Sequence, residues 1–106
     1  MIAAIDNKKE TVETKKIDMA FVKQGFKNVE SYRYNSVSIR IRVVSEKFEG
    51  KSTSEREAMV YPAIIEKLPL STQQDITFLL LETPAESKKK NSHLDLEFDD
   101  PSPSDL

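Results

Sequence analysis

The fold is decided by the stretch Val37-Ser38-Ile39-Arg40-Ile41-Arg42-Val43, in which apolar and polar residues alternate without interruption. Successive side chains of a β-strand point to opposite faces of a sheet. The alternation therefore predicts a strand with its four apolar residues on a core and Arg40 and Arg42 on a wetter face. The preceding run Val29–Tyr34 is rich in strand formers, and Asn35-Ser36 between the runs is typical of a short turn. We therefore expect an antiparallel hairpin with one covered face.

A helix is predicted before the hairpin and another after it. Residues 11–24 place apolar side chains at three- and four-residue spacing. Gly25 ends this helix, because glycine readily adopts the left-handed conformation of a C-terminal cap. The second helix has two possible starts, since two serine–glutamate pairs have the spacing of a capping box. They are Ser54 with Glu57, where we expect the helix to begin, and Ser52 with Glu55.

The second half of the chain supplies one more strand. Pro62 predicts a kink or a break near Tyr61, because proline removes a backbone hydrogen bond and crowds the preceding turn. After the polar turn Ser71–Asp75, the run Ile76–Leu81 is apolar at odd and even positions, which is typical of a buried strand. The order helix, strand, strand, helix, strand predicts an α+β fold, a small layer sandwich with a three-stranded mixed sheet and helices on one face.

Length and composition allow one small domain and exclude several chemistries. The chain has 106 residues, of which 38% are hydrophobic and 32% charged, with two glycines and no cysteine. Glycine-rich nucleotide loops, disulfides and thiolate nucleophiles are therefore excluded. The only histidine, His93, lies in an acidic tail, so neither a Ser-His-Asp nor a Cys-His catalytic arrangement is expected. Without a membrane-spanning run or a signal peptide, we expect a soluble cytoplasmic protein that binds no membrane.

Charge and polarity divide the chain into three parts. Residues 14–87 form the predicted domain, preceded by a flexible N-terminal extension over residues 1–13. Residues 88–106 are predicted to be a disordered acidic tail. Within the tail Leu94, Leu96 and Phe98 alternate with acidic residues, which is compatible with a short partner-binding strand as well as with a solvated tail.

Several short motifs occur in the order found in the BolA family. They are Ser31-Tyr32-Arg33-Tyr34-Asn35, Val44-Ser45-Glu46-Lys47-Phe48-Glu49-Gly50-Lys51-Ser52, Arg56 with Val60-Tyr61, and Thr83-Pro84-Ala85-Glu86. Over residues 14–87 the chain thus resembles that family, whose fold is like a class II KH domain. The resemblance implies a non-enzymatic protein-interaction module, an adaptor for a monothiol glutaredoxin in iron–sulfur, iron or stress-linked regulation. The implied partner-binding residues are Phe48, Gly50, Lys51, Arg56, Asp75, Thr83 and Pro84.

Two departures from the family concern metal chemistry. Many BolA-like proteins share a [2Fe–2S] cluster with their glutaredoxin, and the family has histidines at the positions of Glu57 and Asp75. Cluster iron favours thiolate and imidazole donors over carboxylates, so these substitutions count against direct ligation. We expect the chain alone to bind no metal or cofactor, and any [2Fe–2S] cluster to be shared within a complex.

The alternative function is a KH-like nucleic-acid-binding transcriptional regulator that uses the basic face of the hairpin. Aromatic side chains at Tyr32 and Tyr34 are suited to stacking on bases. A KH domain needs a GXXG loop, however, and Gly50 has no second glycine after it. We therefore expect a protein partner ahead of nucleic acid. The candidate nucleic-acid-binding residues are Arg33, Arg40, Arg42, Lys47 and Lys51.

Overall fold

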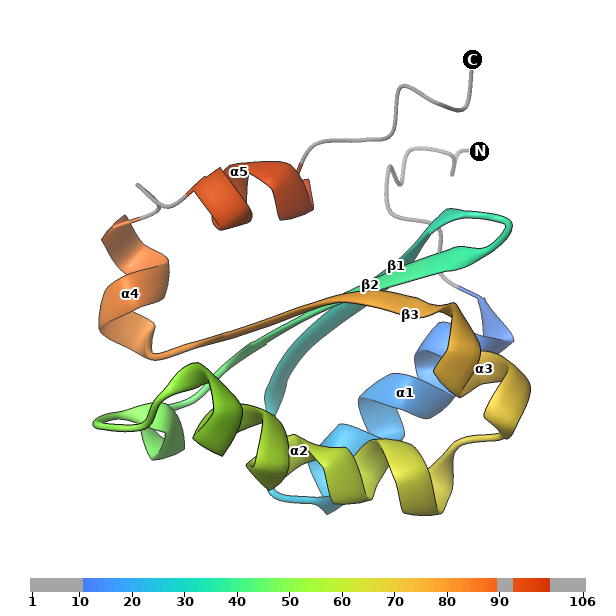
Figure 1. Ribbon diagram of the computed structural model, residues 1–106, viewed down its shortest axis with the longest axis horizontal. Coiled ribbons are helices and arrows are strands. Elements are labelled where there is room, and N and C mark those ends of the chain that lie inside the picture. Colours follow the sequence, from blue (N-terminus) through green and yellow to red (C-terminus); the bar gives the residue numbers. More distant parts are fainter. Residues whose placement is uncertain (1–10, 90–92, 100–106) are drawn as a thin grey trace.

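The alternating stretch forms the central strand of a three-stranded mixed sheet, in the order β1-β2-β3 (Figure 1). The computed structural model describes residues 11–89 and 93–99 and confirms the α+β class. Strands β1 and β2 are antiparallel, whereas β2 and β3 are parallel. The elements are α1 (Val12–Lys23), β1 (Asn28–Asn35), β2 (Ser38–Val44), the 3-10 turn η2 (Glu46–Phe48), α2 (Thr53–Lys67), α3 (Leu70–Asp75), β3 (Ile76–Glu82), α4 (Pro84–Lys89) and α5 (His93–Asp99).

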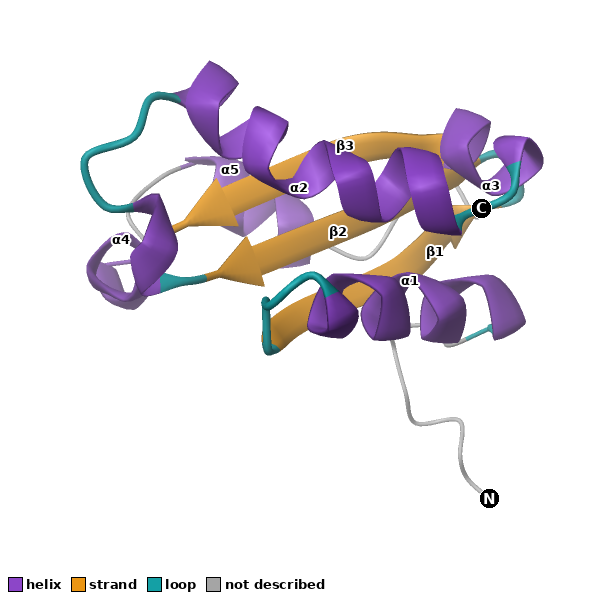
Figure 2. Ribbon diagram, turned by 90° about the horizontal axis from the view of Figure 1, so that it is seen from below, coloured by secondary structure: helices purple, strands orange, loops and turns teal. Residues whose placement is uncertain are grey.

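The main core lies between the sheet and helices α1 and α2, which cover one face (Figure 2). The alternation of β2 places Ile39, Ile41 and Val43 on this face, where all three are fully buried. Val37 does not join them. It lies in the hairpin turn, where its backbone N–H donates to the Asn35 side chain over 2.9 Å, and its side chain is exposed. Strand β2 therefore begins at Ser38, one residue later than the alternation predicts.

The first helix agrees with the sequence prediction at both ends. Thr11 and Thr14 form a reciprocal capping box at its start. At its end Gly25 has a φ of 106°, and the Phe26 N–H donates to the Phe21 carbonyl over 2.9 Å. This left-handed cap turns the chain back, so that Phe26 is buried on the helix it follows.

The second helix begins earlier than predicted and is not broken into two pieces. The N-cap of α2 is Ser52, whose side chain accepts from the Glu55 N–H, rather than Ser54. The helix then runs without a break through Pro62. A proline at this position leaves the carbonyl of Ala58 without its helical donor. Ala58 is exposed, so that this carbonyl lies at the hydrated side of the helix.

Two segments that were predicted to lack regular structure are helical. Residues 71–75, predicted as a turn, belong to α3 (Leu70–Asp75). Residues 93–99, predicted as part of a disordered tail, form α5, which contacts β2 and β3 on the face opposite to α1 and α2 (Figure 1). The helices therefore cover both faces instead of one, because Phe98 supplies a fully buried ring that repays the ordering of α5. Residues 1–10, 90–92 and 100–106 of the predicted extension and tail lie outside the described residues. None of the described helices is long and apolar enough to cross a membrane.

Candidate functional site

All of the implied partner-binding residues except Asp75 meet at one end of the sheet. Because β2 and β3 are parallel, their carboxyl ends lie side by side. The loop after β2 carries Phe48, Gly50 and Lys51, and Thr83 with Pro84 directly follows β3 (Figure 1). Arg56, in the first turns of α2, lies between these two segments.

Arg56 connects the segments through every nitrogen of its guanidinium. Its Nη1 donates to the Leu81 carbonyl over 2.9 Å, and its Nε donates to the Lys51 carbonyl over 3.0 Å. Its Nη1 and Nη2 donate to the two carboxylate oxygens of Glu86 over 2.8 and 3.2 Å. A two-pronged arginine–carboxylate pair fixes orientation as well as charge. Arg56 thereby joins the loop after β2, the end of β3 and helix α4.

The segment Thr83–Glu86 forms a third capping box, after those of α1 and α2. The Thr83 N–H donates to the Glu86 carboxylate over 2.9 Å, and the Glu86 N–H donates to the Thr83 hydroxyl over 3.2 Å. Pro84 occupies the first position of α4, where no N–H is needed. The Arg56 hydrogen bond, followed by that of the Thr83 backbone, lowers the pKa of Glu86 to about 2. Glu86 is therefore ionised and paired over the whole physiological range.

The six clustered residues differ in what they offer a partner. Phe48 is fully buried and stacks on Phe26 with ring centroids 5.4 Å apart, so it anchors the loop from inside. Thr83 is also buried. Gly50 and Lys51 are exposed, and Gly50 has a φ of 75°, which favours glycine. The accessible groups of this cluster are therefore those of the exposed loop, of Arg56 and of α4.

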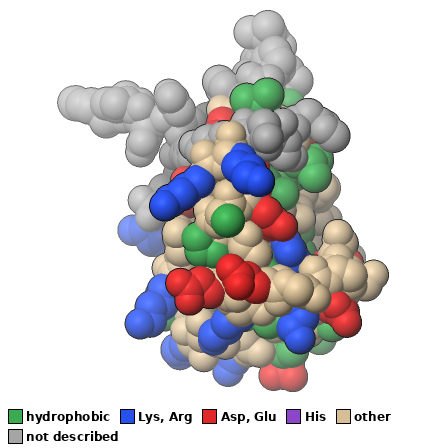
Figure 3. All heavy atoms as spheres, turned by 90° about the vertical axis from the view of Figure 1, so that its left-hand side faces the viewer, with side chains coloured by type: hydrophobic (Ala, Val, Ile, Leu, Met, Phe, Trp, Pro, Cys, Tyr) green, Lys and Arg blue, Asp and Glu red, His purple; other side chains and the backbone are tan. Residues whose placement is uncertain are grey.

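A cleft of about 370 Å³ borders this cluster along the outer edge of β3. It is lined by Thr53, Arg56, Glu57, Leu79, Leu80, Leu81, Glu82, Glu86, Lys89 and Leu94. A second cleft of about 340 Å³ continues along the same strand between α2 and α3. Since β3 is the last strand in the sheet order, no described strand pairs with this edge. Figure 3, which shows this end of the molecule, displays acidic and basic side chains interspersed around small apolar areas.

Asp75 lies apart from the cluster, at the opposite end of β3. Its carboxylate accepts from Arg33 Nη2 over 2.9 Å. An ion pair with an arginine leaves this carboxylate poorly suited to act as an iron ligand. Across residues 11–89 and 93–99 no three His, Cys, Asp or Glu side chains are grouped so that they could hold a metal ion. The described donor set does not fit a [2Fe–2S] cluster.

The five candidate nucleic-acid-binding residues do not form one surface. Arg33 pairs with Asp75, and Lys47 Nζ donates to the Gly25 carbonyl over 3.0 Å. Lys51 lies on the exposed loop at the far end of the sheet. Arg40 and Arg42 project from β2 as predicted, but α5 covers them and only 7% and 6% of their surface is exposed.

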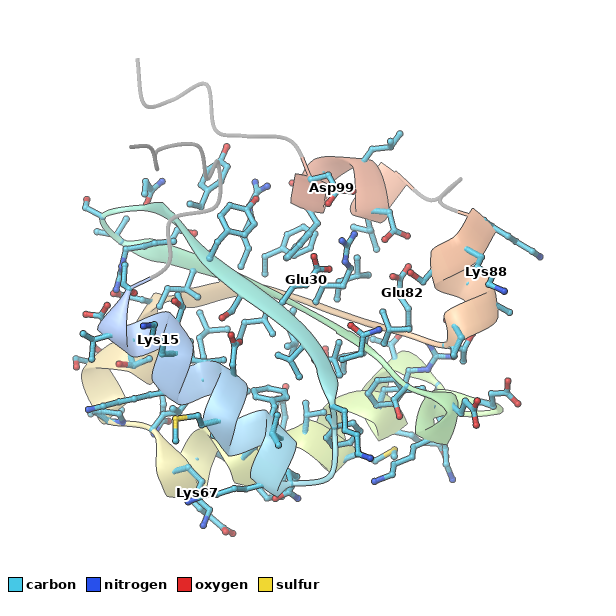
Figure 4. The ribbon with its side chains drawn as sticks, turned by 180° about the vertical axis from the view of Figure 1, so that it is seen from behind. Lys15, Glu30, Lys67, Glu82, Lys88 and Asp99 are labelled. Atoms are coloured by element: carbon cyan, nitrogen blue, oxygen red, sulfur yellow. The ribbon has the colours of Figure 1, made fainter. Side chains whose placement is uncertain are left out.

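A buried polar cluster under α5 is the feature that sequence reasoning missed. Arg42 lies 2.6 Å from Glu30, 3.2 Å from Asp95 and 3.2 Å from Asp99, measured between nitrogen and carboxylate oxygen. Figure 4 shows Glu30, Glu82 and Asp99 on this side of the sheet. The available signal was the spacing of Asp95, Phe98 and Asp99, which places all three on one face of a helix.

Two carboxyl groups in this cluster share one environment. Burial, and after it the neighbouring Asp95 carboxyl, raises the pKa of Glu82 to about 8. Glu82 Oε1 and Asp95 Oδ2 are buried without a hydrogen-bond partner among the described residues. The raised pKa favours the neutral form of the Glu82 carboxyl, while the Asp95 carboxylate pairs with Arg42 over 3.2 Å.

Comparisons with known proteins identify no relative, since no family model, curated protein or solved structure matches the chain. The likeness to BolA proteins therefore rests on the motifs quoted above.

Proposed function

We propose that the protein is a non-enzymatic BolA-like interaction module, an adaptor whose partner docks on the cleft beside the carboxyl end of β3. The observation that carries the proposal is the convergence of three separate segments on the Arg56–Glu86 ion pair. These segments are the loop of residues 48–51, the start of α2, and Thr83-Pro84. They are the same segments on which the resemblance places partner binding.

The chemistry of the cleft supports a protein as the partner. Leucine side chains of β3 lie among residues of both charges, namely Arg56 and Lys89 with Glu57 and Glu86. Protein interfaces combine an apolar centre with a mixed polar rim in this way. An unpaired strand edge also offers backbone groups to a partner chain. A monothiol glutaredoxin is the specific partner that the resemblance suggests.

Docking on this cleft needs no cluster ligand from this chain. The ion-paired Asp75 and the lack of a grouped donor set in the described part favour an adaptor that recognises the partner protein itself. The iron-linked, stress-linked and transcriptional roles of BolA-like proteins remain proposals that depend on this partner. The alternative, nucleic-acid binding on an open hairpin face, has less support because α5 buries Arg40 and Arg42.

An NMR titration of isotope-labelled protein tests the proposal. Monothiol glutaredoxin is added first in its apo form and then loaded with a [2Fe–2S] cluster. We expect shifts at residues 49–56 and 79–89 with both forms, because the surface is complete without the cluster.

Two charge reversals sharpen the titration. Lys51→Glu, on the exposed loop, is expected to weaken binding several-fold, whereas Lys15→Glu, on the exposed face of α1, leaves it unchanged. Shifts centred on Asp75 and Arg33 would contradict the cleft. Unchanged spectra with both forms would contradict the glutaredoxin partner.

A further inference from the structure

Helix α5 lies on the outer face of the sheet, opposite to α1 and α2, and one aromatic ring anchors it there (Figure 1). The fully buried Phe98 ring meets Tyr32 edge to face, with centroids 5.2 Å apart, and lies 6.0 Å from Phe78. The Tyr32 hydroxyl donates to the Phe98 carbonyl, and Arg40 Nη1 donates to the Glu97 carbonyl. The face therefore accepts a helix that carries an aromatic residue near its carboxyl end.

Charge complementarity sets a second condition on the occupant of this face. Arg42 Nη1 lies 3.2 Å from an Asp95 oxygen, and Arg42 Nη2 lies 3.2 Å from an Asp99 oxygen. Arg40 is buried beside Arg42 under the same helix. Two arginines buried on one face favour an acidic occupant, because a buried charge without an opposite charge is strongly destabilising. In α5 the carboxylates stand three residues before Phe98 and one residue after it.

Helix α5 is nevertheless an imperfect occupant. Asp95 Oδ2 and Glu82 Oε1 are both buried without a hydrogen-bond partner among the described residues. Burial, and after it the Asp95 carboxyl, raises the pKa of Glu82 from an ordinary 4.5 to about 8. Docking of α5 at neutral pH therefore requires Glu82 to take up a proton. A helix with a neutral hydrogen-bond donor in place of Asp95 removes this requirement, because it can donate to the Glu82 carboxylate.

Release of α5 would expose the face without opening the main core, which lies on the other side of the sheet. The helix has seven residues, too few to be stable without its contacts. We propose that the outer face around Tyr32, Arg40 and Arg42 is a docking site for an acidic, phenylalanine-bearing helix of a partner protein, and that α5 occupies this site as an internal competitor. The partner helix repeats the phenylalanine of α5 and the carboxylate that follows it, and carries an amide or hydroxyl side chain where α5 has Asp95.

The tether of α5 sets how the two helices compete. A tethered helix acts at an effective concentration in the millimolar range, so it masks the face against a partner helix of similar affinity. The apparent affinity for a partner is reduced by the fraction of molecules in which α5 has left the face. Any change that weakens α5 alone should therefore tighten binding of the partner helix. The proposal holds whether or not a protein docks on the cleft beside β3.

Fluorescence anisotropy with a labelled peptide tests the proposal on the full chain. The peptide has the sequence of residues 90–101 with the substitution Asp95→Asn. In the protein, Phe98→Ala removes the ring of the competitor and is expected to bind the peptide about tenfold or more tightly than the wild type. Leu96→Ala is the matched control, because Leu96 lies on the same helix and is 63% exposed. The control should bind the peptide like the wild type.

Changes in the peptide test the chemistry of the site without altering the protein. With the Phe98→Ala protein, a peptide that keeps Asp95 should bind several-fold more weakly than the Asp95→Asn peptide. Asp99→Asn in the peptide should also weaken binding several-fold, because it removes a carboxylate from Arg42. A peptide with Phe98→Ala should show no measurable binding. On the protein side, Arg42→Gln added to Phe98→Ala should weaken binding, while amide protection of β1 and β2 shows that the sheet is intact.

Four results would overturn the proposal. The first is equal affinity of the wild type and the Phe98→Ala protein for the peptide, and the second is equal binding of peptides with and without the phenylalanine. The third is tighter binding of a labelled oligouridine than of the peptide to the Phe98→Ala protein, which would assign the face to nucleic acid. The last is a wild-type dimer in analytical ultracentrifugation that Phe98→Ala abolishes, which would assign the face to a second copy of this chain.

Discussion

Removing the Phe98 ring should release α5 from the sheet and leave the main core folded. Phe98 is fully buried and packs with Tyr32 and Leu80, with Phe78 beside them. Truncation of a buried phenylalanine to alanine costs about 3–5 kcal/mol. Helix α5 has seven residues, which is too short to be stable without its contacts. The free energy lost with the Phe98 ring is therefore expected to exceed the free energy that keeps α5 docked on the sheet.

Native-state hydrogen exchange separates this local effect from global unfolding. In Phe98→Ala the amides of α5 should lose their protection, while those of α1 and α2 keep theirs, because the main core lies on the opposite face of the sheet. Unfolding by urea, followed by far-UV circular dichroism, should show a midpoint lowered only by the free energy that α5 docking contributes.

Leu96→Ala provides the comparison within the same helix. Its side chain is 63% exposed, so the free energy of unfolding should change by no more than about 0.5 kcal/mol. Equal effects of the two substitutions would refute the reasoning. A loss below about 1 kcal/mol in Phe98→Ala would also refute it, because the ring would then contribute little to docking.

Three further predictions follow from the caps and carboxyl groups. Ser52→Ala should lower the free energy of unfolding by about 1 kcal/mol and Ser54→Ala by much less, because only Ser52 caps α2 in the structure; equal urea midpoints would contradict this. In the folded state the pKa of Glu82 is about 8, compared with its ordinary value of 4.5. The contribution of Glu82 to the free energy of unfolding is therefore full below pH 4.5 and is lost as the pH rises from 4.5 to 8. Glu82→Gln should flatten that part of the pH profile, and parallel profiles would exclude this assignment. The lowered pKa of Glu86 has the opposite effect on stability: the contribution of Glu86 to the free energy of unfolding is full above pH 4.5 and is lost as the pH falls towards 2. Glu86→Gln should therefore remove this acid-dependent part of the change in the unfolding midpoint. An unchanged dependence of the midpoint on pH below 4.5 would contradict this.

Several features of the fold were readable from local sequence because their causes are local. The alternation from Ile39 to Val43 places three residues on the core. Gly25 ends α1, and a serine–glutamate pair starts α2, since caps depend on residues within one turn. The choice between Ser52 and Ser54 was not readable, because both pairs have the same spacing.

The apolar pattern of β3 carried more information than the sequence prediction used. Leu81 belongs to the main core, whereas Leu80 packs with Phe98 on the other face. A strand with apolar side chains on both faces needs other elements packed on both faces, and α5 packs on the face that α1 and α2 leave open. Three alternating residues in an acidic tail predicted a strand or no structure, and only contact with the sheet selects a helix.

By itself the sequence determined the strands, the first two helices and the absence of cysteine chemistry, because periodicity, capping and composition act over a few neighbouring residues. Only the tertiary structure decided which charges meet. Arg42 pairs with Asp95 across 53 positions of the chain, and Arg56 pairs with Glu86 across 30. Such pairs depend on how the parallel strand and the final helix return to the sheet, and no local spacing encodes that return. The same long-range packing gathers the segments that we propose to bind a partner at one end of β3 and leaves Asp75 at the other.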